Sequence, residues 1–277
     1  MTQASVVTRM RTGDIRSVPL AFWLFAILTA LDAYLYIATG AINDLSDVMS
    51  LFTFAVAPLL FATAVAWVQP VDLRYLWGAA FIAASELPNL IEMSLTQFLG
   101  FSFDWGLGLR PSSLTWGLEL IGVALVALAI GGIHQRRNWL WPALGLAIFI
   151  IGDIENAFFW SGQPAQDPDF ATSPLVVAIT FVGGLTILAW SYLLGSAIER
   201  RRWLFALGSG IFVALGAFGL FDELVFPLFP PPTDGGFSLL YWPLTATNVV
   251  GWVAMIVAAL REVPRRGSNE ELAEALT

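Results

Sequence analysis

The chain has 277 residues, of which 57% are apolar and 12% charged, and its mean hydropathy is +0.74. This composition excludes an ordinary soluble domain, because several runs of about 20 apolar residues are each long enough to cross a bilayer. The formal net charge of -8 gives no reason to expect a nucleic-acid partner. The lipid bilayer is the partner that the composition predicts.

The residue types that the chain lacks limit its chemistry. It has no Cys, which excludes disulfides, thiolate zinc sites and iron–sulfur clusters, and no Lys, which excludes a retinal Schiff base. Its one His, His134, falls in a polar loop, so haem held between two His and a zinc site built from several His are excluded as well. We therefore expect no cofactor.

Eight apolar segments are predicted to be transmembrane helices, which makes the expected fold an all-α polytopic bundle. The segments are 18–39, 48–68, 75–98, 114–133, 139–160, 174–198, 203–226 and 239–260. The transmembrane domain then covers residues 18–260, between an N-terminal segment of residues 1–17 and a C-terminal tail of residues 261–277. The connectors are short, so no soluble domain is expected between the spans.

Arginine predicts the orientation of these spans. Twelve of the 13 basic residues fall in the N-terminal segment, the tail and alternate connectors, and Arg110 is the exception. By the positive-inside rule, both termini are expected on the cytoplasmic side of a bacterial or archaeal membrane. The remaining connectors carry acids that would concentrate cations, unless they only reflect the absence of Arg there: Asp44, Asp47, Asp104, Asp167, Asp169 and Asp234.

Tryptophans and glycines are expected to have structural roles. The tryptophans near the predicted span ends are interpreted as interfacial anchors: Trp67, Trp77, Trp139, Trp141, Trp160, Trp203 and Trp242. Gly183 with Gly184, and Gly145 with Gly152, are interpreted as faces where helices pack closely, rather than as ligand contacts.

An acid recurs in each of the four outward-running spans. These acids, at intervals of 60, 63 and 67 residues, are Asp32, Glu92, Glu155 and Asp222. The spacing suggests four repeated helical hairpins, at 18–68, 75–133, 139–198 and 203–260. Chance similarity among oily helices is the alternative, because single acids and small residues are all that align.

The third span has the strongest polar pattern. One helix face would carry four polar residues: Ser85, Asn89, Glu92 and Thr96. That face cannot point at lipid, because an uncompensated carboxylate inside a bilayer costs several kcal/mol. Pro88, at the same level, is expected to kink the helix and free carbonyl oxygens that could coordinate a cation. The alternative is a face that locks the bundle through interhelical hydrogen bonds.

Counting along the spans places the candidate site residues in the outer third of the bilayer. The ligand- or cation-binding candidates are Asp32, Asn89, Glu92, Glu119, Glu155, Asn156 and Asp222, and the secondary candidates are Glu86, Asp153, Glu223 and Asn248. No basic residue lies within a span, so each acid must be protonated, share a proton, reach water or hold a cation. The inner halves of the spans are almost wholly apolar, which predicts a pocket open to the extracytoplasmic side rather than a pore.

Three functions are compatible with this pattern. The favoured one is a secondary transporter, or another membrane protein that binds a cation, a proton or a small ligand from the extracytoplasmic side. The second is an integral membrane enzyme that acts on a lipid or isoprenoid, with two carboxyls as general acid and base. The third is a non-catalytic sensor, assembly factor or structural subunit, in which the acids serve helix packing. An enzymatic role is the less favoured.

Overall fold

The computed structural model describes residues 27, 30, 48–49, 51–85, 87–88, 100, 113–131, 143–147, 174–220 and 241–265. Within these ranges the chain is helical, and the one strand-like feature is an isolated antiparallel bridge between Pro70 and Arg265. The all-α class predicted from the composition is therefore confirmed.

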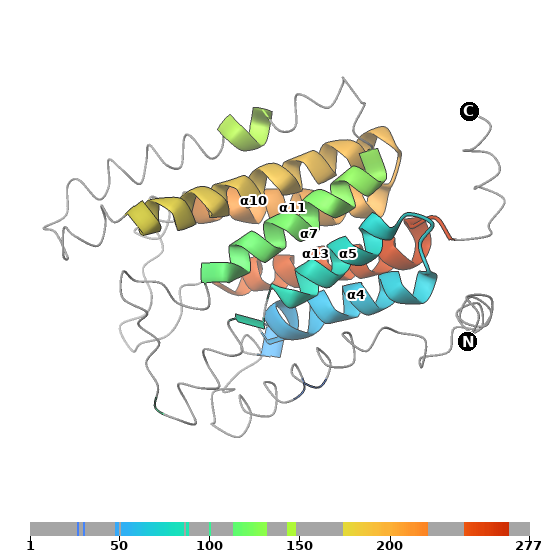
Figure 1. The fold of residues 1–277 in the computed structure, drawn as a ribbon, viewed down its shortest axis with the longest axis horizontal. Helices are drawn as coiled ribbons and strands as arrows, with labels where there is room; N and C mark the ends of the chain where they lie inside the picture. The colour runs from blue at the N-terminus through green and yellow to red at the C-terminus, as the bar shows by residue number, and fades with distance from the viewer. Residues whose placement is uncertain are drawn as a thin grey trace, which may run out of the picture.

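Figure 1 labels the principal helices. In chain order, the elements are the π-helix η2 (Phe52–Val56) and the α-helices α4 (Ala57–Val68), α5 (Leu73–Ala84), α7 (Ser113–Gly131), α10 (Pro174–Glu199), α11 (Trp203–Leu220) and α13 (Tyr241–Glu262). A further helical piece covers residues 143–147. The long helices are rich in Leu, Ala, Val, Ile and Phe on all sides, which is typical of helices buried in a core or in lipid.

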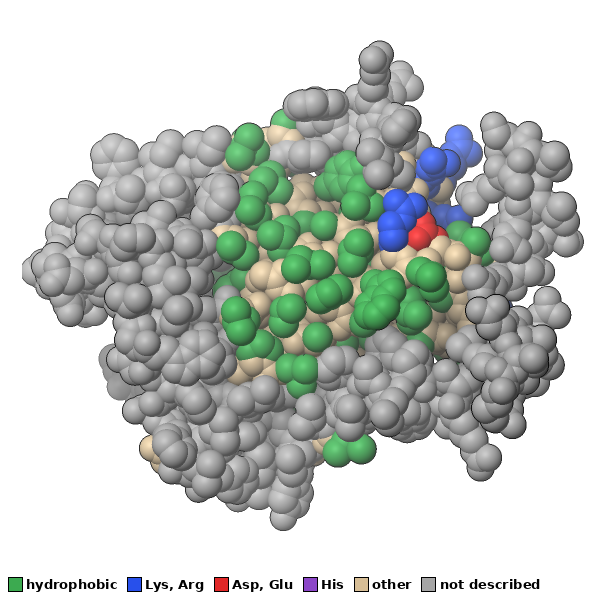
Figure 2. Space-filling view, in the orientation of Figure 1, with side chains coloured by type: hydrophobic (Ala, Val, Ile, Leu, Met, Phe, Trp, Pro, Cys, Tyr) green, Lys and Arg blue, Asp and Glu red, His purple; other side chains and the backbone are tan. Residues whose placement is uncertain are grey.

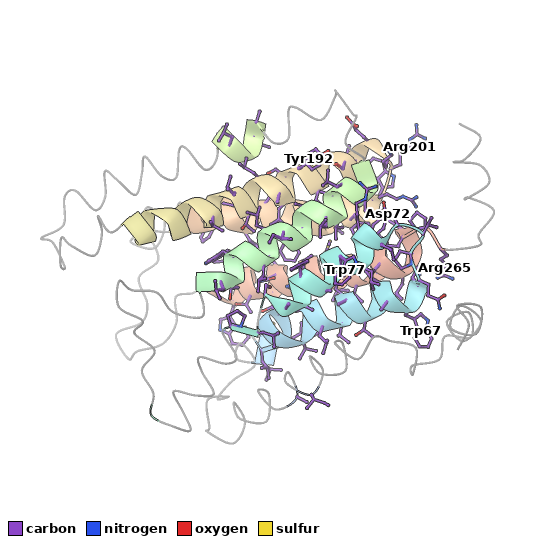
Figure 3. All side chains as sticks on the ribbon, viewed as in Figure 1. Trp67, Asp72, Trp77, Tyr192, Arg201 and Arg265 are labelled. Carbon is purple, nitrogen blue, oxygen red and sulfur yellow. The ribbon has the colours of Figure 1, made fainter. Side chains whose placement is uncertain are left out.

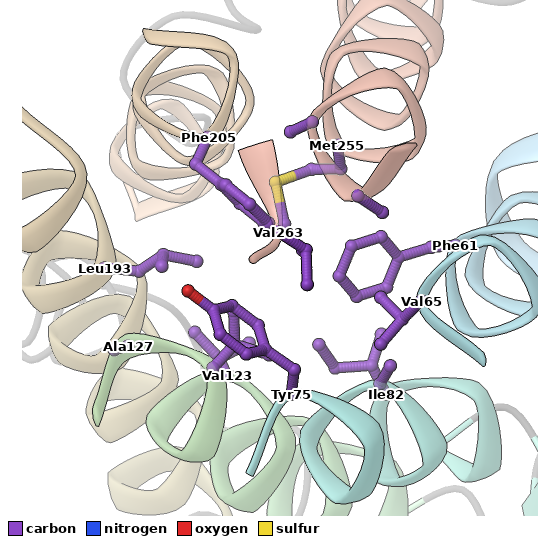
Figure 4. Packing of buried hydrophobic residues seen from close by; sticks show 14 of the residues in the cluster. Phe61, Val65, Tyr75, Ile82, Val123, Ala127, Leu193, Phe205, Met255 and Val263 are labelled. Atoms are coloured by element: carbon purple, nitrogen blue, oxygen red, sulfur yellow. The ribbon is translucent and has the colours of Figure 1, made fainter. Parts of the chain in front are cut away.

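The six α-helices named here form a closed ring within the part of the chain that the structure describes. Each packs against the next in the order α4, α5, α7, α10, α11 and α13, and α13 packs against α4 to complete the circle. Figure 4 shows large apolar side chains from these helices pointing into the ring, among them Phe61, Tyr75, Leu193, Phe205 and Met255. These side chains are at most 3% exposed, so this part of the ring is filled rather than open.

Two of the helices are long and apolar enough to cross a membrane, at Leu114–Gly131 and Trp242–Glu262. Shorter apolar helices occupy Ala57–Val68, Leu73–Ala84 and Trp203–Phe218. Within the two long segments, 33% and 39% of the residues are buried, whereas the core helix of a soluble protein is mostly buried. On the face seen in Figure 2, the described side chains are mostly apolar, apart from Arg and Asp side chains at one end. The number of eight spans stays a prediction.

Two prolines explain irregularities in the second and third predicted spans. Pro58 has no N–H for the regular ladder, and the chain just before it forms the π-helix η2, in which Ala57 N donates to Phe52 O. Helix α5 ends at Ala84, four residues before Pro88, whose ring would clash with the Ala84 carbonyl. The hydroxyl of Ser85 donates to Ile82 O (2.7 Å) at this end. The predicted kink at Pro88 stays a prediction, because residues 89–99 lie outside the described residues.

One end of the bundle, which we call the basic end, collects every Arg that the structure describes: Arg74, Arg200, Arg201, Arg202, Arg261 and Arg265. The turns between α4 and α5 and between α10 and α11 lie at this end, and each contains a non-glycine residue in the left-handed region, Gln69 and Arg201. Val71 N donates to Pro264 O (3.2 Å), which ties the end of α13 to the first turn. This distribution agrees with the predicted charge asymmetry of the connectors.

Two carboxylates cap helices at the basic end. Asp72 accepts hydrogen bonds from Arg74 N (2.8 Å) and from the Arg74 guanidinium, and so begins α5. Glu262, the last residue of α13, accepts from the backbone N–H groups of Leu204 (2.9 Å) and Phe205 (3.1 Å) in the first turn of α11. Both satisfy N–H groups that an uncapped helix would leave without a partner. The exposed indoles of Trp67 and Trp77 lie near this end, as expected for interfacial anchors.

Candidate functional site

Glycines set the closest helix approaches in the ring. A Cβ built on Gly78 of α5 would lie 2.7 Å from Gly122 O of α7, and a Cβ built on Gly122 would lie 2.7 Å from Gly78 O. In the same way, a Cβ on Gly208 of α11 would lie 2.7 Å from the Met255 side chain and 3.1 Å from Gly251 O of α13. Both pairs of antiparallel helices therefore cross with their backbones nearly touching.

These two crossings correspond along the sequence. Gly122 and Gly251 are 129 residues apart, as are Glu119 and Asn248, while Gly78 and Gly208 are 130 apart. Glu119 and Asn248 thus take the same place, each three residues before the glycine at its crossing. The correspondence relates the second and fourth predicted hairpins. The repeat of all four hairpins stays a prediction.

At two places in the ring, neighbouring helices run in the same direction. We call these two helix–helix contacts the α7–α10 seam and the α4–α13 seam. All four helices end at the basic end, so each seam joins two parallel helices. Glu119 belongs to the helix on one side of the first seam, and Asn248 to the helix on one side of the second. Both lie in the half of the bundle away from the basic end.

Glu119 is held across the α7–α10 seam. Its Oε1 accepts a hydrogen bond from Nε1 of Trp190 (2.9 Å), whose side chain is only 4% exposed. One turn nearer the start of both helices, the Thr186 hydroxyl donates to Trp116 O (3.3 Å) and to Val182 O (3.1 Å). The one donor to this carboxylate within the described residues is a neutral indole, because every described Arg lies at the basic end.

Asn248 has a different environment at the α4–α13 seam. Its Oδ1 is buried and accepts no hydrogen bond from any residue that the structure describes. One helical turn deeper, Trp252 contacts the Phe61 ring of α4, with centroids 6.4 Å apart. An amide oxygen buried without a donor loses its hydration without compensation, at a cost of about 1–3 kcal/mol. A group that donates to Oδ1 would recover this energy.

A row of aromatic rings joins the two seams. Trp190 and Phe212 have centroids 4.5 Å apart, Phe212 and Trp252 are 5.1 Å apart in an edge-on arrangement, and Trp252 continues the row to Phe61. Its Trp190 contacts Glu119 directly, and its Trp252 lies one turn nearer the basic end than Asn248. The predicted loss of polarity midway along the bundle stays a prediction, and buried Ser191, Ser196 and Ser209 lie in the half nearer the basic end.

Most of the predicted site lies outside the described residues. This holds for Asp32, Asn89, Glu92, Glu155, Asn156 and Asp222, and for the secondary candidates Glu86, Asp153 and Glu223. Among the described residues, no three His, Cys, Asp or Glu side chains gather as metal ligands. The convergence of the carboxylates stays a prediction, with Glu119 and Asn248 as its two described members.

Trp190 is the site residue that the sequence analysis missed. It lies inside an apolar helix rather than near a span end. Its sequence context therefore does not distinguish a hydrogen-bond donor from an aromatic residue of the core. One signal was available: an intramembrane carboxylate without a basic partner needs a neutral donor, and an indole N–H in a neighbouring span can supply it.

No protein-family model, curated protein or solved structure matches this chain. The function must therefore be argued from the site itself.

Proposed function

We propose that this protein is a multi-pass membrane protein of eight spans, with both termini on the cytoplasmic side. Exposed apolar side chains on the outer surface of the bundle support this. Trp77 (60% exposed), Leu207 (51%) and Val250 (52%) would be costly to hydrate, and lipid would cover them. The concentration of the described Arg residues at one end supports the orientation.

We further propose that an outward-facing carboxylate site in this bundle binds a proton or a cation and serves secondary transport. The observation that carries the proposal is Glu119, a carboxylate within an apolar helix whose one described donor is a neutral indole. A neutral donor leaves the negative charge uncompensated, so a proton or a cation is the remaining means of balancing it in a membrane. Access from one side is supported by the place of Glu119 in the first half of α7, away from the basic end.

Proton movement into proteoliposomes tests this function. Vesicles that contain purified protein and a trapped pH-sensitive dye would receive an inward sodium gradient or a membrane potential. We expect wild-type vesicles to change internal pH faster than protein-free vesicles, and Glu119→Gln to reduce the rate to that of protein-free vesicles. Glu262→Gln is the matched control, because that carboxylate caps α11 at the basic end. Equal rates for wild type and Glu119→Gln, or no protein-dependent flux in wild type, would reject the proposal.

A second candidate function is supported by the same contact. The Trp190 hydrogen bond joins two parallel helices, so Glu119 could serve helix association in a non-catalytic sensor or structural subunit. Glu119→Gln separates the two candidates, because Gln keeps an acceptor for the indole but cannot carry a charge. A variant that is as stable as wild type and has lost proton flux supports transport. Unchanged flux with a stability loss in Glu119→Leu supports the packing role.

A further inference from the structure

Both seams join parallel helices, but their acceptors differ in hydrogen-bond state. At the α7–α10 seam, the acceptor on Glu119 meets the indole of Trp190. At the α4–α13 seam, the corresponding residue Asn248 lies on the same helix face as Trp252, whose partner on α4 is Phe61, a ring with no polar group. Phe61 is 129 residues before Trp190, the same separation that relates Asn248 to Glu119. The second seam therefore has the acceptor without the donor.

We infer that the α4–α13 seam is a second binding site, in which Asn248 Oδ1 accepts a hydrogen bond from the ammonium group of a small amine. A native structure rarely retains a buried acceptor without a partner, and a ligand is one of the few causes. The inference adds a site and a ligand class to the proposed function and does not require Glu119 to bind anything.

The chemistry of the seam selects an ammonium group. The acceptor is a neutral amide oxygen, which takes an N–H donor without requiring a fixed ion pair. Trp252 lies one turn deeper between Phe61 and Phe212, and aromatic faces, Trp above all, attract cations within about 6 Å of the ring centre. An ammonium group would supply the donor that Oδ1 lacks, and its charge would lie toward the Trp252 ring one turn deeper.

The backbone beside the seam gives a second, independent indication. The π-helix η2 packs against α13, and it comes directly before α4, on the side of Phe61 away from the basic end. π-Helical turns are uncommon and occur frequently at functional sites. Here the irregular turn lies toward the same end of the seam as Asn248, which is where a ligand from the extracytoplasmic side would arrive.

Thermal unfolding of the purified protein in lipid nanodiscs tests the inference with two probes. Methylammonium has N–H donors and tetramethylammonium has none, although both carry a single charge. We expect methylammonium chloride to raise the unfolding temperature of wild type with a saturable dependence on concentration, and tetramethylammonium chloride at equal ionic strength to raise it several-fold less. Equal shifts with the two salts, or with sodium chloride, would overturn the inference. The absence of any shift would do so too and would mean that Oδ1 meets water alone.

Two variants remove the response by opposite routes. Asn248→Leu has nearly the same shape and no acceptor, and Phe61→Trp supplies an indole where the other seam has one. Both are expected to lose the methylammonium shift, whereas Glu119→Gln is expected to retain it. A response that persists in Asn248→Leu overturns the assignment even where Phe61→Trp fails to fold. The Glu119→Gln control keeps this outcome separate from failure of the proposed transport function.

Discussion

Gly78 and Gly122 meet backbone to backbone: a Cβ on either residue would lie 2.7 Å from the carbonyl oxygen of the other. Such a contact cannot be relieved by a side-chain rotation, because the opposing atoms belong to the main chain. It fixes the distance between α5 and α7 and, through it, the place of Glu119 one turn away.

Alanine at either glycine should separate these helices. We expect Gly78→Ala and Gly122→Ala each to lower the free energy of unfolding by about 1–3 kcal/mol, the usual range for overpacking. Gly208→Ala should cost less, because the nearest atoms there belong to the flexible Met255 side chain. Chemical unfolding of the purified protein in detergent micelles measures all three.

Gly117 of α7 is the matched control. A Cβ there meets nothing within 4 Å, so Gly117→Ala should be neutral or should stabilise the helix by up to about 1 kcal/mol. Equal effects of Gly78→Ala and Gly117→Ala would contradict the close crossing.

The hydrogen bond between Trp190 and Glu119 should appear as an energetic coupling. We expect Trp190→Phe and Glu119→Leu each to destabilise the protein, and the double variant to cost less than the sum of the two by about 1 kcal/mol, in the range found for hydrogen bonds between membrane helices. A double-mutant cycle of unfolding free energies measures this. Trp77→Phe, at an indole that is 60% exposed, serves as the control and should show no coupling to Glu119. Additive effects of Trp190→Phe and Glu119→Leu would mean that the contact adds no stability.

Local sequence patterns predicted the features that are determined within a single helix. The helical class follows from long apolar runs, and the exposure of Trp67, Trp77, Trp203 and Trp242 follows from their places near span ends. The end of α5 at Ala84 was not predicted, since a kinked helix over 75–98 was expected there. The interpretation of Gly145 as a packing residue is also confirmed, since it lies directly against Ser191. Apart from the contact of Gly145 with Ser191, which joins two helices, these features depend on residues close together in the sequence.

The features that depend on helix pairing could not be predicted in the same way. The chain has 24 glycines, and nothing local distinguishes Gly78 and Gly122 from the others until the ring order brings α5 against α7. The donor role of Trp190 likewise requires α10 to lie beside α7, because Trp190 and Glu119 are 71 residues apart in the chain. The correspondence of Glu119 with Asn248 was also missed. The predicted repeat was based on one acid in each outward-running span, whereas Glu119 and Asn248 lie in returning spans.

Asp72 should make the stability of the basic end depend on pH. Partial burial alone would raise the pKa of its carboxyl, but the hydrogen bonds and the positive charge of Arg74 outweigh burial and hold this pKa below its ordinary value of 3.8. Because the folded-state pKa is lowered, the carboxylate stabilises the folded protein fully above the unfolded-state pKa. This stabilisation is lost as the pH falls through the lowered folded-state value.

The comparison of Asp72→Asn with wild type isolates this effect. Asn keeps an acceptor for Arg74 N but loses the charge, so the difference in unfolding free energy between the two proteins should be constant near pH 7 and shrink below about pH 4. Asp72→Ala, which also loses the helix cap, should cost about 0.5–2 kcal/mol near neutral pH. A wild-type advantage that is the same at pH 3 and pH 7 would show that the ion pair with Arg74 does not stabilise the fold.

Ser191 should be one of the few positions where removal of a polar group stabilises this protein. Its hydroxyl is fully buried in α10 with no hydrogen-bond partner among the described residues, and it lies 2.6 Å from where a Cβ on Gly145 would be. Ser191→Ala therefore should leave the free energy of unfolding unchanged or raise it by about 1 kcal/mol, because an orphaned hydroxyl is removed with little loss of volume. Gly145→Ala should destabilise wild type and cost less in the Ser191→Ala background, since the nearest obstacle is then a Cβ at 3.0 Å. Unfolding measurements on the two single variants and the double variant decide this. A loss of stability on Ser191→Ala would show that the hydroxyl has a hydrogen-bond partner in the membrane-embedded protein.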